Sequence, residues 1–436
     1  MAELTFEMDW EDPLGARGPE LRATWARLEV RVGEEVVTRV FDARTRSVRD
    51  SIYLPLYPLA EWVATNWWRL LYEVRSSGDF EPHRCPARHC LRRGSEGFAF
   101  PDLTFEPMGA QVRLSWAGKR LEHSPLEFLG RETVYLSREA VEEGLRQLVD
   151  AVLGRLEDHE VAETLLQQEW RALQALDDEE QDFCRRAGAL GLDPFRVGED
   201  QAEQLVTAAR RLPGALQEEF FASADPANYP QEAEAVARVL ESVRGEHEGL
   251  EPLRELRERG TLPGTVGGPP WNQGYEMARA LRAELGLDGR PLPSFAAIAS
   301  ALGVEEARLT PTISRARELG TVDGLVAFDD ERRPGFALRA TAEEARRFGF
   351  CRTFFEFLTG SGLAPSIITR GATDRQQRNR AFAAEFLAPS ERLRARSPGE
   401  VVTPDEVDEL ARDFGVSWAV VSHQLQNHRI ARVSTD

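Results

Sequence analysis

Apolar and polar residues along the first 150 positions predict short strands around one long helix. Residues 26–43, "ARLEVRVGEEVVTRVFDA", hold two β-rich runs on either side of Gly33-Glu34-Glu35, which is a hairpin pattern. Pro58 then suits the first turn of a helix. Apolar residues follow at helical spacing, at Leu59, Val63, Trp67, Leu70 and Val74. Residues 98–109 and 110–118 predict two more strands, so residues 1–150 are expected to form an α+β domain.

Residues 151–260 predict an acidic helical region. The segment "DEEQDFCRRAGALGL" begins with acidic residues in its first turn and ends near Gly191, as helices often do. Residues 259–274, "RGTLPGTVGGPPWNQG", contain three prolines and five glycines. Such a stretch interrupts regular structure, so a linker is expected over residues 261–270 and a further domain over residues 271–436.

The negative charge is concentrated in the middle of the chain. The 436 residues carry a formal net charge of −19, and residues 151–260 hold 25 Asp and Glu against 12 Arg, a net of −13. Broad binding to a phosphate backbone needs a positive surface, so the charge argues against nucleic acid as a partner. A solvated helical face is the favoured interpretation, and a docking surface for a basic partner is the alternative.

Other features narrow the class of protein. No apolar run approaches the roughly 20 residues that cross a bilayer, and the acidic start "MAELTFEMDWEDPLG" does not resemble a signal peptide. Four cysteines are too few for a disulfide framework, so a cytoplasmic protein with reduced thiols and no membrane contact is expected. Six of the nine tryptophans precede residue 117, and their periodicity favours a core over a base- or sugar-binding face.

One short segment contains metal-binding residue types. "HRCPARHC" places His83, Cys85, His89 and Cys90 within eight residues. The spacing matches no common zinc module and has no second half, so a loop with ordinary thiols is expected here.

The C-terminal part shows an ordered series of elements. Residues 271–309 look like the opening helices of a known domain family, "VDGLVAFDDERRPGFAL" (322–338) like its paired strands, "ARRFGFCRTFFEFL" (345–358) like its active-site helix, "RQQRNRAFAAEFLAPSERL" (375–393) like the helix that follows, and residues 408–430 like its closing helix pair. In order and spacing, residues 271–436 resemble the ImmA/IrrE family of metallo-endopeptidase domains. The resemblance implies a zincin-like α+β fold, within an α+β multidomain chain.

The resemblance also indicates where a zinc site would lie. Family members typically read Arg-Phe-x-x-x-His-Glu-x-x-His on the active helix, where two histidines four apart can ligate zinc and the glutamate is the general base. Matching Arg347-Phe348 to that motif puts Arg352 and Glu356 at the two histidines and Thr353 at the glutamate. The third ligand, a glutamate on the next helix, falls at or near Gln376 or Arg378.

These residue types do not suit zinc. A guanidinium has no lone pair to donate, threonine supplies no carboxylate base, and one glutamate alone does not make a site. No catalytic residue, no metal ligand and no cofactor is therefore expected, although zinc is the family's metal. Arg352 and Glu356 are four apart and opposite in charge, so a structural ion pair between them is predicted. The alternatives are a helix unrelated to the family and a peptidase that is still active.

The closing residues resemble a helix-turn-helix. In "LARDFGVSWAVVSHQL", Ser417 would cap the second helix after a stop at Gly415, and His423 and His428 decorate that helix. Residues 391–436 carry six Arg against eight Asp and Glu, which disfavours DNA contact.

Active family members cleave repressor-type proteins. The sequence therefore favours a catalytically degenerate member that binds or senses a protein, in stress regulation or phage defence. An extended protein segment is expected beside an edge strand at "PGFALRA" (334–340). The alternatives are an active metallo-endopeptidase with an atypical site that cleaves a repressor-type protein, and a transcription regulator that uses the C-terminal helix pair.

Overall fold

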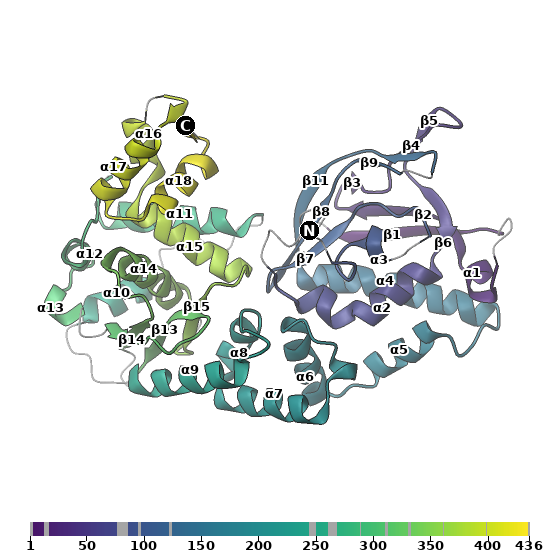
Figure 1. Ribbon diagram of the computed structural model, residues 1–436, viewed down its shortest axis with the longest axis horizontal. Helices are drawn as coiled ribbons and strands as arrows, with labels where there is room; N and C mark the ends of the chain where they lie inside the picture. The colour runs from purple at the N-terminus through teal and green to yellow at the C-terminus, as the bar shows by residue number, and fades with distance from the viewer. Residues whose placement is uncertain are drawn as a thin grey trace. The chain divides into compact units, whose positions relative to one another are not determined.

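A computed structural model shows a mixed α+β chain with several small sheets and many helices (Figure 1). The structure describes residues 3–12, 17–75, 86–94, 97–121, 124–243, 250–259, 268–287, 289–309, 313–329, 333–360, 362–397 and 399–434. Among these residues, no helix is both long enough and apolar enough to span a bilayer.

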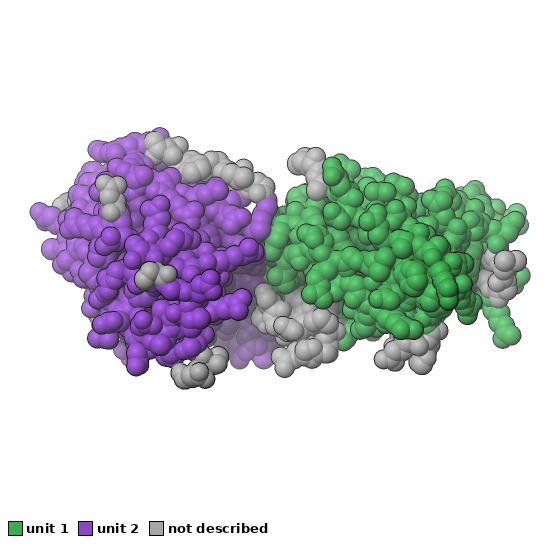
Figure 2. Space-filling view, turned by 90° about the horizontal axis from the view of Figure 1, so that it is seen from above, with its two compact units in different colours: residues 1–205 green, residues 206–436 purple. Residues whose placement is uncertain are grey.

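The chain divides into two compact units, Met1–Leu205 and Val206–Asp436, which Figure 2 colours separately. The acidic helices predicted over 151–260 are shared between the units, because the earlier ones pack on the N-terminal strands and helices and the later ones on the C-terminal sheet. The sequence predicted domain boundaries at residue 150 and at the 261–270 linker. Whether the pieces between these boundaries fold independently stays a prediction.

Unit 1 combines three sheets with helices. Its strands are β1 (Leu4–Trp10), β2 (Trp25–Val32), β3 (Glu35–Val36), β4 (Val40–Asp42), β5 (Ser47–Arg49), β6 (Ile52–Pro55), β7 (Thr104–Pro107), β8 (Gln111–Trp116), β9 (Lys119–Arg120), β10 (Leu126–Phe128) and β11 (Glu132–Ser137). Its helices are α1 (Pro19–Ala23), α2 (Tyr57–Tyr72), α3 (Leu91–Gly94), α4 (Arg138–Asp158), α5 (Leu165–Gln174), α6 (Asp178–Ala189) and the short 3-10 helix η2 (Pro194–Arg196); α7 (Glu199–Arg211) crosses into unit 2.

The strands of unit 1 pair antiparallel. The first sheet has β2 between β1 and β3, with β6 also on β2; the second has the order β5-β4-β10-β9 and the third β11-β8-β7. The predicted hairpin at Gly33 is confirmed, since Val32 pairs with Glu35 and Gly33 takes a φ of 61° that glycine tolerates. The second β-rich run of the prediction forms two strands that belong to different sheets: β3 pairs in the first sheet and β4 in the second.

Helices α2 and α4 form the main helical support of unit 1 (Figure 1). The predicted helix at Pro58 is confirmed as α2, and it buries Trp62, Trp67 and Trp68, in accord with the core interpretation of the tryptophans. Helix α4 approaches β1 closely at Gly144, where a Cβ atom would lie 2.2 Å from the Leu4 carbonyl oxygen. Only glycine permits that approach.

Unit 2 holds one larger sheet inside helices. Its helices are α8 (Gly214–Phe221), α9 (Tyr229–Val243), α10 (Glu251–Arg259), α11 (Pro270–Glu284), α12 (Phe295–Ala301), α13 (Glu306–Leu309), α14 (Glu343–Thr359), α15 (Asp374–Leu387), α16 (Ser390–Arg396), α17 (Pro404–Phe414) and α18 (Trp418–Asn427). Its strands are β12 (Ile313–Arg315), β13 (Val322–Phe328), β14 (Pro334–Leu338), β15 (Ser366–Thr369), β16 (Val401–Val402) and β17 (Arg432–Val433).

The larger sheet has the order β12-β14-β13-β15. The predicted strand pair at 322–338 is confirmed as antiparallel β13 and β14. The expectation that 334–340 forms an edge strand is wrong, because β12 pairs parallel with the other side of β14. Within the described part of unit 2, the edges of this sheet are β12 and β15.

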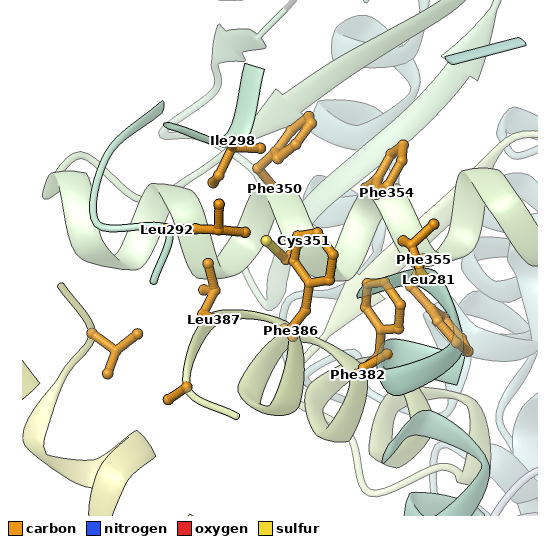
Figure 3. Close-up of a cluster of buried hydrophobic side chains, with 14 of the residues drawn as sticks. Leu281, Leu292, Ile298, Phe350, Cys351, Phe354, Phe355, Phe382, Phe386 and Leu387 are labelled. Carbon is orange, nitrogen blue, oxygen red and sulfur yellow. The ribbon is translucent and has the colours of Figure 1, made fainter. Parts of the chain in front are cut away.

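Helix α14 lies at the centre of unit 2. Its phenylalanines enter a buried cluster with side chains from α11, α12 and α15, which Figure 3 shows pointing toward one another. Helix α11 packs on α15 so closely that a Cβ on Gly274 would lie 2.2 Å from the Arg378 carbonyl oxygen. The end of the proline- and glycine-rich stretch (residues 259–274) is therefore part of this packed helix, because α11 begins at Pro270. Residues 260–267 of the stretch lie outside the described residues.

Candidate functional site: a buried polar centre between α14 and α15

The positions singled out by the family resemblance lie on two contacting helices. Helix α14 carries Arg352, Thr353 and Glu356, and α15 carries Gln376. All four residues are buried, at 5%, 0%, 2% and 0% exposed respectively. A helix that is buried on most of its surface needs partners for its polar groups, since an unpaired buried charge is costly.

Arg352 supplies the central cation. Its Nε donates to Asn379 Oδ1 at 2.8 Å, and its Nη2 donates to the Thr369 carbonyl oxygen at 2.7 Å and to Gln376 Oε1 at 2.8 Å. Its Nη1 lies 3.3 Å from Asp323 Oδ2, which gives an ion pair. All three nitrogens of the guanidinium therefore donate, in four hydrogen bonds that fix the plane of the group.

Glu356 has a different cationic partner from the one predicted. Its Oε2 lies 2.5 Å from Arg375 Nε, and its Oε1 accepts from Asn379 Nδ2 at 3.0 Å. The predicted ion pair between Arg352 and Glu356 is wrong. The two side chains diverge, toward β13 and β15 in one case and toward Arg375 in the other, and Asn379 bonds to both.

Gln376 lies in the centre and Arg378 does not. The Gln376 carboxamide donates to the Ile367 carbonyl oxygen at 3.1 Å and accepts from the Thr369 N–H at 2.8 Å. Ile367 and Thr369 are two residues apart on β15, so the backbone groups that they offer point to the same side of the strand. Gln376 bonds to both groups and so satisfies the outer edge of β15 as a neighbouring strand would. The Arg378 side chain instead pairs with Asp374 at 2.6 Å.

A carboxyl group from helix α8 completes the centre. Glu219 Oε2 accepts from Gln376 Nε2 at 2.8 Å and from Thr373 Oγ1 at 2.9 Å. Burial raises the pKa of Glu219 to about 7, although Arg375 and the Gln376 hydrogen bond act in the opposite direction. Helix α8 lies next to β15 and belongs to the same compact unit, although the sequence prediction placed it in a separate region.

Thr353 does not face this network. Its hydroxyl donates to the carbonyl oxygens of Gly349 and Phe350, at 3.2 Å and 2.9 Å, within its own helix. The Thr353 hydroxyl is therefore satisfied within its own helix, as is common for threonine in a helix interior.

Burial also acts on Arg352 itself. Desolvation lowers the pKa of its guanidinium to about 10, Arg380 acts in the same direction, and Asp323 opposes both. The group therefore remains charged at neutral pH and holds a fixed positive charge at the centre.

The residues present do not fit a zinc ion. Arg352 cannot donate a lone pair, and both Glu356 oxygens are engaged by Arg375 and Asn379. In the part of the chain that the structure describes, no group of three or more His, Cys, Asp or Glu side chains is arranged to hold a metal ion. No chemical step through a metal is derived from this site.

Comparison with known proteins does not add an identity. No family model, no curated protein and no solved structure matches the chain. The resemblance to ImmA/IrrE domains therefore stays a prediction from the order and spacing of the sequence segments.

Two other candidate segments have structural roles. His83 and Cys85 lie outside the described residues. His89 is buried, with Nε2 3.0 Å from Glu73 Oε2 and Nδ1 3.2 Å from the Phe105 carbonyl oxygen, and the Cys90 thiol lies 3.2 Å from Asp102 Oδ1. Both side chains thus have protein partners within unit 1.

The predicted helix pair at the end of the chain is confirmed as α17 and α18. Gly415 ends α17 with a φ of 61°, and Ser417 is the N-cap residue of α18, but its side chain makes no capping hydrogen bond. Helix α18, "WAVVSHQLQN", contains neither arginine nor lysine.

Several members of the centre escaped the sequence prediction. Asn379 lies one turn after Gln376 on the same helix, so helical spacing could have pointed to it. Asp323 and Glu219 are brought in by the sheet and by α8. Glu219 is 157 positions from its partner Gln376, which no local pattern relates to it.

Proposed function

We propose that this protein is a catalytically degenerate relative of ImmA/IrrE peptidases that acts by binding or sensing another protein, in stress regulation or phage defence. The observation that carries the proposal is the Arg352 guanidinium, which occupies the first ligand position and is held by four hydrogen bonds. A peptidase of this family needs a metal-bound water at that place. A fixed cation there opposes a divalent ion, and Thr353 supplies no base to activate water.

The sheet edges bear on how a protein segment could be held. The outer backbone groups of β15 are occupied by Gln376 and by Arg352. An added strand would have to displace them, whereas β12 ends the described sheet on the other side. We therefore assign strand addition to the β12 edge, where main-chain hydrogen bonds would supply affinity.

The two alternatives receive less support. An active peptidase would need a metal ligand, which Arg352 does not provide, and a general base, which Thr353 does not provide. A DNA-reading role for α18 would need basic residues, and those are missing from its sequence.

The proposal is tested by digestion of an unfolded protein such as β-casein, with and without added zinc. The wild-type chain is expected to leave the substrate intact under both conditions. The variant Arg352→His with Thr353→Glu and Glu356→His is also expected to be inactive, because Gln376 still stands at the third ligand position. Zinc-dependent cleavage by the wild-type chain would refute the proposal. So would a captured partner that is cleaved rather than retained as a complex.

A further inference from the structure

Arginines gather at one end of the larger sheet of unit 2. Asp323 lies near the start of β13, Arg339 follows the last residue of β14, and Arg370 follows the last residue of β15. These strands are neighbours in the sheet, so the three residues meet at the same end. The Asp323 carboxylate accepts from Arg339 at 2.7 Å and from Arg370 at 3.4 Å. It also accepts from Arg352 at 3.3 Å, so one carboxylate serves three guanidiniums.

A fourth arginine, Arg380 on α15, has no carboxylate partner among the described residues. Its Nη2 donates to the carbonyl oxygens of Gly371 and, at 3.4 Å, of Thr369. The same Thr369 oxygen accepts from Arg352 at 2.7 Å, so two guanidiniums approach one carbonyl group. Desolvation lowers the pKa of the Arg380 guanidinium. Like charges this close repel each other, and a partly buried charge without a counter-ion is costly.

The charges at this end of the sheet do not balance. What we call the arginine cluster consists of Asp323, Arg339, Arg352, Arg370 and Arg380. Four arginines against one carboxylate leave a net charge of +3, in a chain whose net charge is −19. Glu356 in the polar centre is neutralised by Arg375. Burial raises the pKa of Glu219 to about 7, so this carboxyl group is about half charged at neutral pH and removes only part of the excess.

Two members of the arginine cluster present unused donors at the surface. The Arg370 side chain is 66% exposed, and its one hydrogen bond to the described part of the chain leaves both Nη atoms unused. Arg339 is 27% exposed and donates to Asp323 through Nη2, which leaves Nη1 unused. Both guanidiniums lie on the same Asp323 oxygen, so their unused donors are close together. A tetrahedral oxyanion can accept from two such guanidinium forks at once.

We infer that the arginine cluster binds a phosphate group, which Arg339 and Arg370 hold at the surface and which the charges of Arg352 and Arg380 attract from the interior. A phosphate monoester carries about −1.5 to −2 charges at pH 7 and three acceptor oxygens. It therefore offsets the excess charge better than a single carboxylate would. The inference rests on the charges of these five residues and not on the proposed function, which the digestion of a protein substrate tests separately.

The experiment titrates the full chain with inorganic phosphate in a calorimeter, at low ionic strength so that salt does not screen the cluster. Phosphate should bind with a Kd below about 1 mM, and acetate, which carries one charge and two oxygens, about ten-fold more weakly. Glycerol 3-phosphate distinguishes the two sources of the group. Tighter binding of this monoester would identify a phosphorylated small molecule as the ligand, and tighter binding of inorganic phosphate would identify the free ion; both outcomes support the site.

Three variants locate the site. Arg370→Gln should weaken phosphate binding about ten-fold, and it should fold because the side chain is exposed. Asp323→Asn should tighten binding several-fold, because it removes the one negative charge of the cluster; a merely structural role of Asp323 would not produce that gain. Arg396→Gln is the matched control, since Arg396 is an exposed arginine on α16 that pairs with Asp413, and it should leave the Kd unchanged.

The variant Arg370→Gln keeps the inference testable even if Asp323→Asn does not fold. No saturable phosphate binding up to about 10 mM would overturn the inference. Equal binding of acetate and phosphate would also overturn it, as would a Kd that Arg370→Gln leaves unchanged or that a folded Asp323→Asn variant raises.

Discussion

Replacing Arg352 tests whether the polar centre holds unit 2 together. Truncation to alanine would remove four hydrogen bonds and leave Asn379 Oδ1 without its donor. The other acceptors keep partial compensation, since the Thr369 carbonyl oxygen also accepts from Arg380 and Asp323 also pairs with Arg339. Hydrogen bonds to charged groups contribute about 1.5–3 kcal/mol each, and part of the loss is compensated, so Arg352→Ala should destabilise unit 2 by about 3–5 kcal/mol.

For a unit of this size, such a loss should lower the melting temperature by roughly 6–20 °C. Arg352→Lys keeps the charge but not the planar fork, and should cost roughly 1–3 kcal/mol. Arg370→Ala is the matched control, because Arg370 contacts the same Asp323 yet is 66% exposed. It should cost less than about 1 kcal/mol.

The assay must separate the two units, because a chain with two compact units need not unfold in one step. Hydrogen exchange of the α14 and α15 amides, measured beside thermal unfolding, reports on unit 2 alone. A double-mutant cycle should give Glu356 a larger coupling with Arg375 than with Arg352, since only the former pair is in direct contact. Equal melting shifts for Arg352→Ala and Arg370→Ala would refute this account of the centre.

Three further predictions concern other parts of the chain. Because burial raises the pKa of Glu219 to about 7 from its ordinary 4.5, the folded state retains a proton; the stability this gives is present below about pH 4.5 and is lost as the pH rises through 7. Glu219→Gln should therefore flatten the pH dependence of unfolding between those values and raise stability at pH 8, and an unchanged slope would count against it. Gly274→Ala should destabilise by about 1–3 kcal/mol or more in denaturant titrations, because its Cβ would overlap the Arg378 carbonyl. Gly154→Ala, on α4 with nothing within 4 Å, should instead gain up to about 1 kcal/mol, and equal effects would contradict the close-packing argument. Limited proteolysis should cut first between α10 and α11, and earlier cutting elsewhere would argue against a linker there.

The spacing of apolar residues gave a correct prediction where an element is long and packs against residues near it in the chain. Helix α2 was predicted from the spacing of apolar residues and the hairpin of β2 and β3 from two β-rich runs, whereas α14, α15, β13 and β14 were predicted from the family resemblance. The family resemblance gave Gln376 or Arg378 as the position nearest the site, and the structure puts Gln376 in the centre.

Strand order and long-range polar contacts could not be predicted in the same way. The three-residue β12 is too short to stand out, so β14 was mistaken for an edge strand. The ion pair of Glu356 was assigned to Arg352 because helical spacing relates only residues on one helix, whereas Arg375 reaches it from α15. Glu219 lies in the centre because α8 packs against β15. That contact depends on the tertiary fold, so no local sequence pattern predicts it.

Zinc content tests the central claim most directly. The full chain would be incubated with zinc, desalted and measured by elemental analysis, beside Glu356→Ala. Because Arg352 holds a fixed charge where the family resemblance puts the first ligand, and Glu356 is bound to Arg375 and Asn379, both proteins should contain far less than one zinc per chain. One zinc per chain in the wild-type protein, lost in Glu356→Ala, would contradict the account.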